Sequence, residues 1–202
     1  MSSIRTNYEN WYSSDEYYWG TEPASFCDRL IQMKPPVAKL LDIGCGEGKD
    51  AVYFAQHYYD VTAFDLTENG IEKTKRLASE RKVNINTFVA DINDFEINDT
   101  FDIIYSTGTV QYLFDENKRP FFEKIAKLTN KNGIVYFNVF VEKSFIPLPP
   151  DWDIEEKMWK TGELFTYFAD WKIIDIKEII FDDNSGGTPH QHCMDTIIAQ
   201  KI

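Results

Sequence analysis

Cysteine is scarce in this 202-residue sequence, which contains three cysteines, Cys27, Cys45 and Cys193, and no C-x-x-C pair. A disulfide-stapled secreted domain needs more and better-spaced cysteines, so the sequence predicts buried, reduced thiols and a cytoplasmic protein. Long apolar runs are missing as well. No stretch approaches the ~20 apolar residues that cross a bilayer, and the polar N-terminus lacks the apolar core of a signal peptide. We therefore expect no membrane partner.

Basic residues are few, with 21 lysines and arginines against 33 acidic residues, a net charge of −12 and a pI of about 4.7. Non-specific binding to DNA or RNA requires clustered lysine and arginine, so we expect no nucleic-acid partner. Hydrophobic residues make up 43% of the chain, which is enough for one well-buried core. We expect a monomer or a homodimer.

Glycine is not abundant, yet three of the ten glycines alternate in one turn, Gly44, Gly46 and Gly48. Residues 40–43 are too short for an amphipathic helix and predict a strand buried on both faces of a parallel sheet. Residues 49–58 have helical spacing. The turn therefore brings a ligand against bare peptide and toward the unpaired N–H groups of a helix start, as in a nucleotide-binding cradle.

Asp42 comes two residues before the first of these glycines. A carboxylate at this point would repel a phosphate and attract an ammonium group. The turn also lacks the G-x-G-x-x-G spacing with which dinucleotide folds bind a pyrophosphate. The alternative is a plain glycine-rich turn between a strand and a helix.

Asp65 ends the next predicted strand, residues 60–65. A carboxylate at the end of the second strand can accept two hydrogen bonds from the vicinal hydroxyls of a ribose, so we predict Asp65 as a ribose ligand. The alternative is a helix N-cap or turn acid ahead of Thr67.

The first 20 residues concentrate aromatic and acidic side chains outside the predicted sheet. Rings such as Trp11, Tyr12 and Trp19 can fold over an open pocket, exclude water and face a cation. The alternative is that these rings only pack the arm onto the domain.

Four further elements follow from the hydrophobic pattern. Residues 121–129 predict a helix, residues 134–141 a strand, and residues 171–181 and 193–202 two closing strands.

The order of these features over residues 39–141 resembles that of the class I S-adenosylmethionine-dependent methyltransferases: a strand, an Asp-x-Gly-x-Gly-x-Gly turn, two strand-end acids and a fourth, aliphatic strand. The phrase at residues 159–171 is similar to the closing helix of the tellurite-resistance methyltransferases, K-x-G-E-L-x-x-Y-F-x-x-W. The resemblance implies a Rossmann-like α/β fold, with a mostly parallel seven-stranded sheet, an antiparallel last strand and helices on both faces. Residues 1–38 would then form an arm and helix of the same domain, and residues 39–202 the methyltransferase domain.

The resemblance also implies S-adenosylmethionine as the cofactor. Asp91 would accept the adenine amino group and the N–H of Ile92 would meet a ring nitrogen, although the polar run 91–94 is also typical of a turn. The expected cofactor residues are Asp42, Gly44, Cys45, Gly46, Gly48, Asp65, Leu66, Asp91, Ile92 and Ser106. The expected substrate-pocket residues are Trp11, Tyr12, Trp19, Thr107 and Tyr112.

The resemblance further implies histidine and arginine near the last strands, where the tellurite-resistance group is thought to hold an anionic substrate. No arginine occurs after Arg119, which leaves His190, His192 and a few lysines. Because imidazole titrates near neutral pH, we predict His190 and His192 as catalytic residues that orient the acceptor or take its proton; a surface loop is the alternative. We predict no metal, because the adjacent ligands His190, His192 and Cys193 lack a distant fourth.

Together these features predict methyl transfer from S-adenosylmethionine to a small acceptor: a thiol, a chalcogen compound or another small metabolite. The sulfonium methyl is already activated, so the protein mainly has to align the nucleophile and exclude water. One alternative is a non-catalytic cofactor-binding or scaffold protein of the same fold, in which the acceptor cavity would be filled. A less favoured alternative is an NAD-dependent oxidoreductase.

Overall fold

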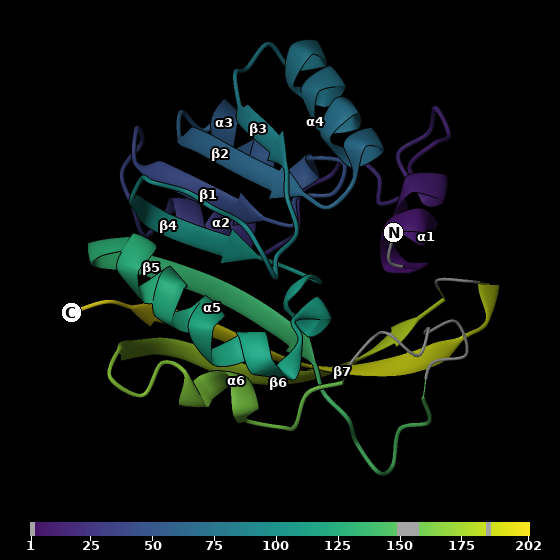
Figure 1. Ribbon diagram of the computed structural model, residues 1–202, viewed down its shortest axis with the longest axis vertical. Helices are drawn as coiled ribbons and strands as arrows, with labels where there is room; N and C mark the ends of the chain where they lie inside the picture. The colour runs from purple at the N-terminus through teal and green to yellow at the C-terminus, as the bar shows by residue number, and fades with distance from the viewer. Residues whose placement is uncertain (1–2, 149–157, 185–186) are drawn as a thin grey trace.

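The computed structural model describes residues 3–148, 158–184 and 187–202, and Figure 1 shows a twisted central sheet with helices packed against it. The helices are α1 (Ser3–Trp11), α2 (Cys27–Ile31), α3 (Lys49–Gln56), α4 (Glu68–Glu80), the 3-10 helix η1 (Val110–Tyr112), α5 (Asp115–Leu128) and α6 (Glu163–Thr166). The strands are β1 (Lys39–Ile43), β2 (Asp60–Asp65), β3 (Asn86–Val89), β4 (Phe101–Ser106), β5 (Thr129–Phe140), β6 (Lys172–Asp183) and β7 (His190–Gln200). None of the helices in these ranges has the length and apolar character needed to cross a membrane.

The seven strands lie in the order β3-β2-β1-β4-β5-β7-β6. Strands β1 to β5 pair in parallel, whereas β7 runs antiparallel to both of its neighbours. This arrangement confirms the predicted fold. The chain builds outward from β1 in one direction and then from β4 in the other, which creates the crevice where open parallel sheets bind ligands.

Strand β1, in the middle of the sheet, is buried on both faces, as predicted for the short strand before the glycine turn. Leu40 packs in a cluster with α2 and α3, whereas its neighbour Leu41 packs in a second cluster with α5 and α6. Successive strand residues point to opposite faces, so adjacent leucines of β1 join the two cores on either side of the sheet. The glycine turn that follows is thereby anchored from both sides.

Helix α5 begins earlier than the pattern predicted. We expected a helix over residues 121–129, after Pro120, but the helix starts at Asp115 and includes Pro120. Asp115 and Glu116 lie in its first turn, where negative charge is favourable, and this offsets part of the cost of the hydrogen bond that proline cannot donate.

The two closing strands extend further toward each other than predicted. β6 runs to Asp183 and β7 begins at His190, so these residues are directly paired across the antiparallel ladder. Long β7 also pairs with β5 over its whole second half. The histidines at 190 and 192 therefore belong to a strand, and the alternative of a surface loop is wrong.

Candidate functional site

A cavity of about 840 Å³ opens at the carboxyl ends of the parallel strands, within the size range of small-molecule sites. Three parts of the chain form its walls. One is the glycine turn with the ends of β2, β3 and β4 and the η1 segment, residues 107–114; the second is the arm, residues 3–20; and the third is the region where β5, β6 and β7 meet. In Figure 1 the purple arm lies beside the end of the sheet, at the side where α4 begins.

The glycine turn has a backbone that side chains would disturb. Gly46 has a φ of 54°, and a Cβ at this position would lie 3.1 Å from the Tyr12 hydroxyl. Gly48, with a φ of 87°, is the N-cap of α3 and does not reach the cavity wall. The predicted cofactor residues on the wall at this turn are Asp42, Gly44, Cys45 and Gly46. The turn thus presents peptide to the cavity, while Gly48 supports its geometry.

Asp42 places a buried carboxylate at the cavity. The residue is 2% exposed, and no hydrogen-bond donor or cation in the described part of the chain contacts its side chain. Burial, followed by the negative charges of Asp50 and Asp65, raises the pKa of Asp42 well above its usual value. A buried carboxylate without a partner is costly, so this position fits a cationic hydrogen-bond donor supplied by a ligand.

The two neighbouring carboxylates are held by the fold itself. Asp50 accepts a hydrogen bond from the Tyr105 hydroxyl at 2.7 Å. Asp65 accepts hydrogen bonds from the N–H of Gly46 at 2.9 Å and from the N–H and hydroxyl of Thr67 at 2.9 and 2.6 Å. Burial raises the pKa of Asp65, and these hydrogen bonds oppose the rise. Asp65 also lies on the cavity wall, so it connects the glycine turn, the start of α4 and the ligand space.

Glu47 fastens the arm over the glycine turn. Its two carboxylate oxygens accept the backbone N–H groups of Tyr18 and Trp19, each at 3.0 Å. The ammonium group of Lys73, from α4, completes the arrangement as a buried ion pair at 2.7 Å and also donates to the carbonyl of Glu16. Both charges are almost fully buried, so the arm is held here by a desolvated and fully partnered ion pair.

The three predicted pocket rings of the arm, Trp11, Tyr12 and Trp19, all lie on the cavity wall. The indole N–H of Trp19 donates to the Tyr12 hydroxyl at 2.9 Å, and burial raises the pKa of Tyr12 well above its usual value. The hydroxyl oxygens of Tyr8 and Tyr112 lie 2.8 Å apart, which joins the arm to η1. The rings therefore both pack the arm onto the domain and face the cavity.

The remaining predicted residues divide into wall and support. Leu66, Asp91, Ile92, Thr107 and Tyr112 lie on the wall. Asp91 accepts a hydrogen bond from the N–H of Asn93 at 2.8 Å, so it also forms the turn proposed as its alternative role. Ser106 lies off the wall and is fully buried, and its hydroxyl donates to the carbonyl of Ile43 at 2.9 Å.

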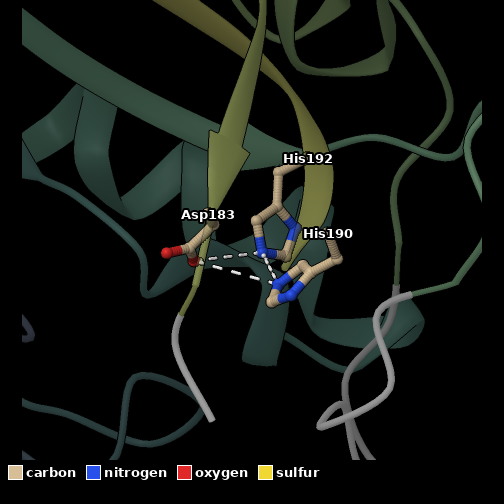
Figure 2. A group of neighbouring side chains, drawn as sticks. All are labelled: Asp183, His190 and His192. Atoms are coloured by element: carbon tan, nitrogen blue, oxygen red, sulfur yellow. Dashed lines mark hydrogen bonds and ion pairs between the residues drawn. The ribbon is translucent and has the colours of Figure 1, made fainter. Parts of the chain in front are cut away.

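Asp183, His190 and His192 converge at the β6 and β7 end of the cavity (Figure 2). The His192 Nε2 atom lies 2.9 Å from Nε2 of His190 and 3.3 Å from Oδ2 of Asp183. The same Asp183 oxygen is 3.9 Å from Nε2 of His190. Asp183 and His192 lie on the cavity wall, and His190 stands beside them.

Sequence reasoning missed Glu47, Lys73 and Asp183. No short motif connects Glu47 with a lysine one helix further on. Asp183 follows another aspartate before a glycine pair, which is typical of a turn. Only the cross-strand register could have identified Asp183. That register depends on the lengths of β6 and β7, which were not evident from the sequence.

Comparison with protein families matches residues 5–186 to the family described as tellurite resistance protein TehB. Among curated proteins, the probable S-adenosyl-L-methionine-dependent methyltransferase TehB of Haemophilus influenzae is 29% identical over 140 residues, which cover 69% of this chain and 48% of that protein. The chain spans about half the length of the curated relatives it matches.

Solved structures also superpose on this chain. The crystal structure of TehB from Haemophilus influenzae superposes with a TM-score of 0.82 at 25% identity, covering 96% of this chain and 67% of that one. A structure described by the conversion of a disulfide bond into a thioacetal group during echinomycin biosynthesis superposes with a TM-score of 0.75 at 18% identity, covering 98% and 92%. At that lower identity the likeness concerns the fold.

Proposed function

This chain belongs to the family of the tellurite resistance protein TehB, and on that premise we propose that it transfers the methyl group of S-adenosylmethionine to a small acceptor with a soft nucleophile, a thiol or another chalcogen compound. A relative named as a probable S-adenosyl-L-methionine-dependent methyltransferase supports both the cofactor and the reaction class, and a relative named as an O-methyltransferase supports the reaction class. The three cysteines are free, which fits action in a reducing compartment such as the cytoplasm.

The acidic cavity around the glycine turn is the observation that carries the proposal. Six of its described wall residues are acids, and Lys49 is the lysine among them; the acids are Asp42, Glu47, Asp50, Asp65, Asp91 and Asp183. S-adenosylmethionine has no phosphate and carries a sulfonium and an ammonium group. Such a wall attracts those cations and repels the pyrophosphate of a dinucleotide.

Each part of the wall has a role for one part of this cofactor. Asp42, buried and without a partner, would accept the ammonium group of the amino-acid tail. The glycine turn would bring its peptide groups against the same tail, and Asp65 has acceptor capacity for the ribose hydroxyls beyond its hydrogen bonds within the fold. Asp91 and Ile92, further along the wall, would meet the adenine.

The cofactor supplies an activated methyl group, so the chain's own task is to place the acceptor and keep water out. The arm supports the second task, because its rings cover the glycine turn and are fastened through Glu47 and Lys73. The open cavity supports catalysis over the scaffold alternative, because space remains on the wall of β5, β6 and β7 where an acceptor can enter.

The charges on the cavity wall affect which kind of acceptor can bind there. An oxyanion would face the acids and Lys49, with no arginine among the described wall residues. A soft nucleophile such as a thiol needs no strong base, because a thiol loses its proton not far above neutral pH and the resulting thiolate is a good nucleophile. His190 and His192, at the acceptor end of the cavity, are the candidate groups to receive that proton or to orient the acceptor.

Calorimetric titration with S-adenosylmethionine, S-adenosylhomocysteine and NAD tests the proposal. We expect micromolar binding of the two sulfur compounds and none of NAD. Asp42→Asn should weaken that binding by about 10- to 100-fold, because it removes a hydrogen bond between charged groups. Asp60→Asn, at the exposed start of β2, is the matched control and should bind normally.

A second measurement follows turnover. S-adenosylhomocysteine should form from S-adenosylmethionine when thiols and selenols are added as acceptors. Binding of NAD alone would overturn the proposal. Tight cofactor binding without turnover on any acceptor would favour the scaffold alternative.

A further inference from the structure

We propose that Asp183, His190 and His192 form a binding site for a divalent, imidazole-preferring metal ion of the zinc type on the acceptor wall of the cavity. The sequence alone argued against a metal, because it offered His190, His192 and Cys193 as adjacent ligands. The fold replaces the cysteine with an aspartate from another strand. The site itself does not depend on the proposed methyl transfer; its role toward the acceptor does.

Strand geometry brings the three side chains to one face. His190 and His192 are two residues apart in β7 and therefore point to the same side, whereas Cys193 points to the other and joins the hydrophobic core. Asp183 pairs directly with His190 across the antiparallel ladder. Directly opposed residues share a face, so Asp183 completes a triangle with the two imidazoles (Figure 2).

The spacing of the ligand atoms suits a metal. Zinc bonds to histidine nitrogen and carboxylate oxygen are about 2.0–2.2 Å long, which places tetrahedral ligand atoms about 3.3 Å from one another. The observed separations are 2.9 Å between the two Nε2 atoms and 3.3 and 3.9 Å from these atoms to Oδ2 of Asp183. All three atoms therefore lie where one ion can contact them with only small side-chain movement.

The surroundings of His190 direct a lone pair toward this point. Its Nδ1 lies 2.7 Å from the carbonyl of Thr188, and a carbonyl can only accept, so Nδ1 carries the hydrogen. In the neutral ring the lone pair is then on Nε2, the atom that faces His192 and Asp183. A histidine ligand whose other nitrogen donates to a backbone carbonyl is the usual arrangement at metal sites.

Two imidazoles and one carboxylate select the kind of ion. Imidazole nitrogen suits zinc and its transition-metal neighbours, whereas magnesium and calcium prefer oxygen ligands. Three protein ligands leave coordination positions open, as in catalytic rather than structural zinc sites. Because Asp183 and His192 lie on the cavity wall, an open position would face the acceptor space.

A cation here would change the charge of a wall that otherwise carries acids. It would give an anionic acceptor, such as a thiolate or a selenolate, a positive partner in a part of the chain that has no arginine after Arg119. Thiolates are also preferred ligands of zinc. In the proposed function, the metal would therefore hold the acceptor's sulfur or selenium atom at the end of the cavity away from Asp42. With the ion bound, His190 and His192 would orient the acceptor as metal ligands and would not receive its proton.

Titration of EDTA-treated protein with Co²⁺, followed by competition with Zn²⁺, tests the site without any cofactor. We expect one Co²⁺ per chain, with the visible absorption of a four- or five-coordinate nitrogen and oxygen site and without a thiolate charge-transfer band. Zn²⁺ should displace it and raise the melting temperature.

The variants Asp183→Asn and His190→Ala should each weaken Co²⁺ and Zn²⁺ binding by about 100-fold or more, since even losing a residue that only supports a ligand costs about 10- to 100-fold. Asp182→Asn and His57→Ala are the matched controls. Asp182 is the neighbouring acid and bonds to Gln191, and His57 is the only other histidine of the chain, so both should bind metal like the wild type.

Circular dichroism and melting curves show whether each variant is folded. Should a ligand variant not fold, the Co²⁺ spectrum of the wild type decides by itself, because a thiolate band would place the ion at a cysteine and overturn the proposal. Unchanged affinity in folded Asp183→Asn and His190→Ala, or no binding of Zn²⁺ at micromolar concentration, would also overturn it, leaving the triad as hydrogen-bonded side chains. Cofactor binding, measured separately, reports on the proposed function.

Discussion

The carboxylate of Asp42 has opposite effects on stability and on binding: its burial lowers the stability of the ligand-free protein, whereas the same buried carboxylate is the proposed partner of the cofactor's ammonium group. Its position at the end of β1 buries it beside Asp50 and Asp65, and this surrounding raises its pKa. A group whose pKa is raised by folding contributes stability that is complete below the unfolded pKa and is lost as the pH rises through the folded pKa. At neutral pH, where the unfolded side chain is ionised, the raised pKa of Asp42 therefore lowers the stability of the ligand-free protein.

We predict that Asp42→Asn stabilises the ligand-free protein at neutral pH by about 1–3 kcal/mol, because the amide fills the same space but has no charge to bury beside Asp50 and Asp65. The difference from the wild type should vanish below about pH 4, where an unfolded aspartate is itself protonated. Urea unfolding at a series of pH values measures it. The control Asp60→Asn should show no gain in stability. If Asp42→Asn were less stable than the wild type at pH 7, Asp42 would have a favourable partner within the fold and the prediction would be wrong.

The arm illustrates how an element far from the sheet in sequence becomes part of the site. Helix α1 and the segment after it contribute Trp11, Tyr12 and Trp19 to the wall. One ion pair, Glu47 with Lys73, lies beneath the backbone of residues 18 and 19, and Glu9 accepts the N–H groups of residues 68 and 69 at the start of α4. The arm is therefore held at several points, and the Glu47–Lys73 pair is the point at which both charges are almost fully buried.

We predict that Glu47→Ala destabilises the protein by about 3–5 kcal/mol, because it leaves the ammonium group of Lys73 buried without its partner. Removing both charges, as in Glu47→Gln with Lys73→Met, should cost less than Glu47→Ala alone. Hydrogen exchange should show faster exchange of the arm in both variants. Equal losses in the single and double variants would mean that the ion pair is not the anchor.

At the scale of helices and strands, the sequence correctly predicted the features that depend on a local pattern of residues. The buried strand, the alternating glycines and Asp65 at a strand end are contiguous features, and they led to the correct fold. Features that depend on register did not follow from pattern. Residue 190 was expected before the last strand rather than in it, so its pairing with Asp183 was not foreseen. Ser106 was expected at the cofactor, yet its hydroxyl turns toward Ile43 because strand β4 packs against β1 there.

For the molecule as a whole, the excess of acids has a consequence for partners. With 33 acidic and 21 basic residues, a net charge of −12 repels the phosphate backbone of nucleic acids. We predict no mobility shift of duplex DNA or structured RNA at micromolar protein and about 0.15 M salt, where screening leaves only short-range contacts. A shift that weakens with added salt would reveal a basic patch and contradict the prediction.

The order of the strands also places the cofactor-binding residues and the proposed acceptor wall on opposite halves of the sheet. The glycine turn and Asp65 come from the half of the sheet built on β1 and β2, whereas the acceptor wall is carried by the pair β6 and β7 at the opposite edge. Most of β7 is buried in the two cores, so only the positions of this hairpin that face the cavity, such as Asp183 and His192, are open to change. Substitutions at those positions would alter acceptor specificity while the contacts that hold the cofactor residues stay the same.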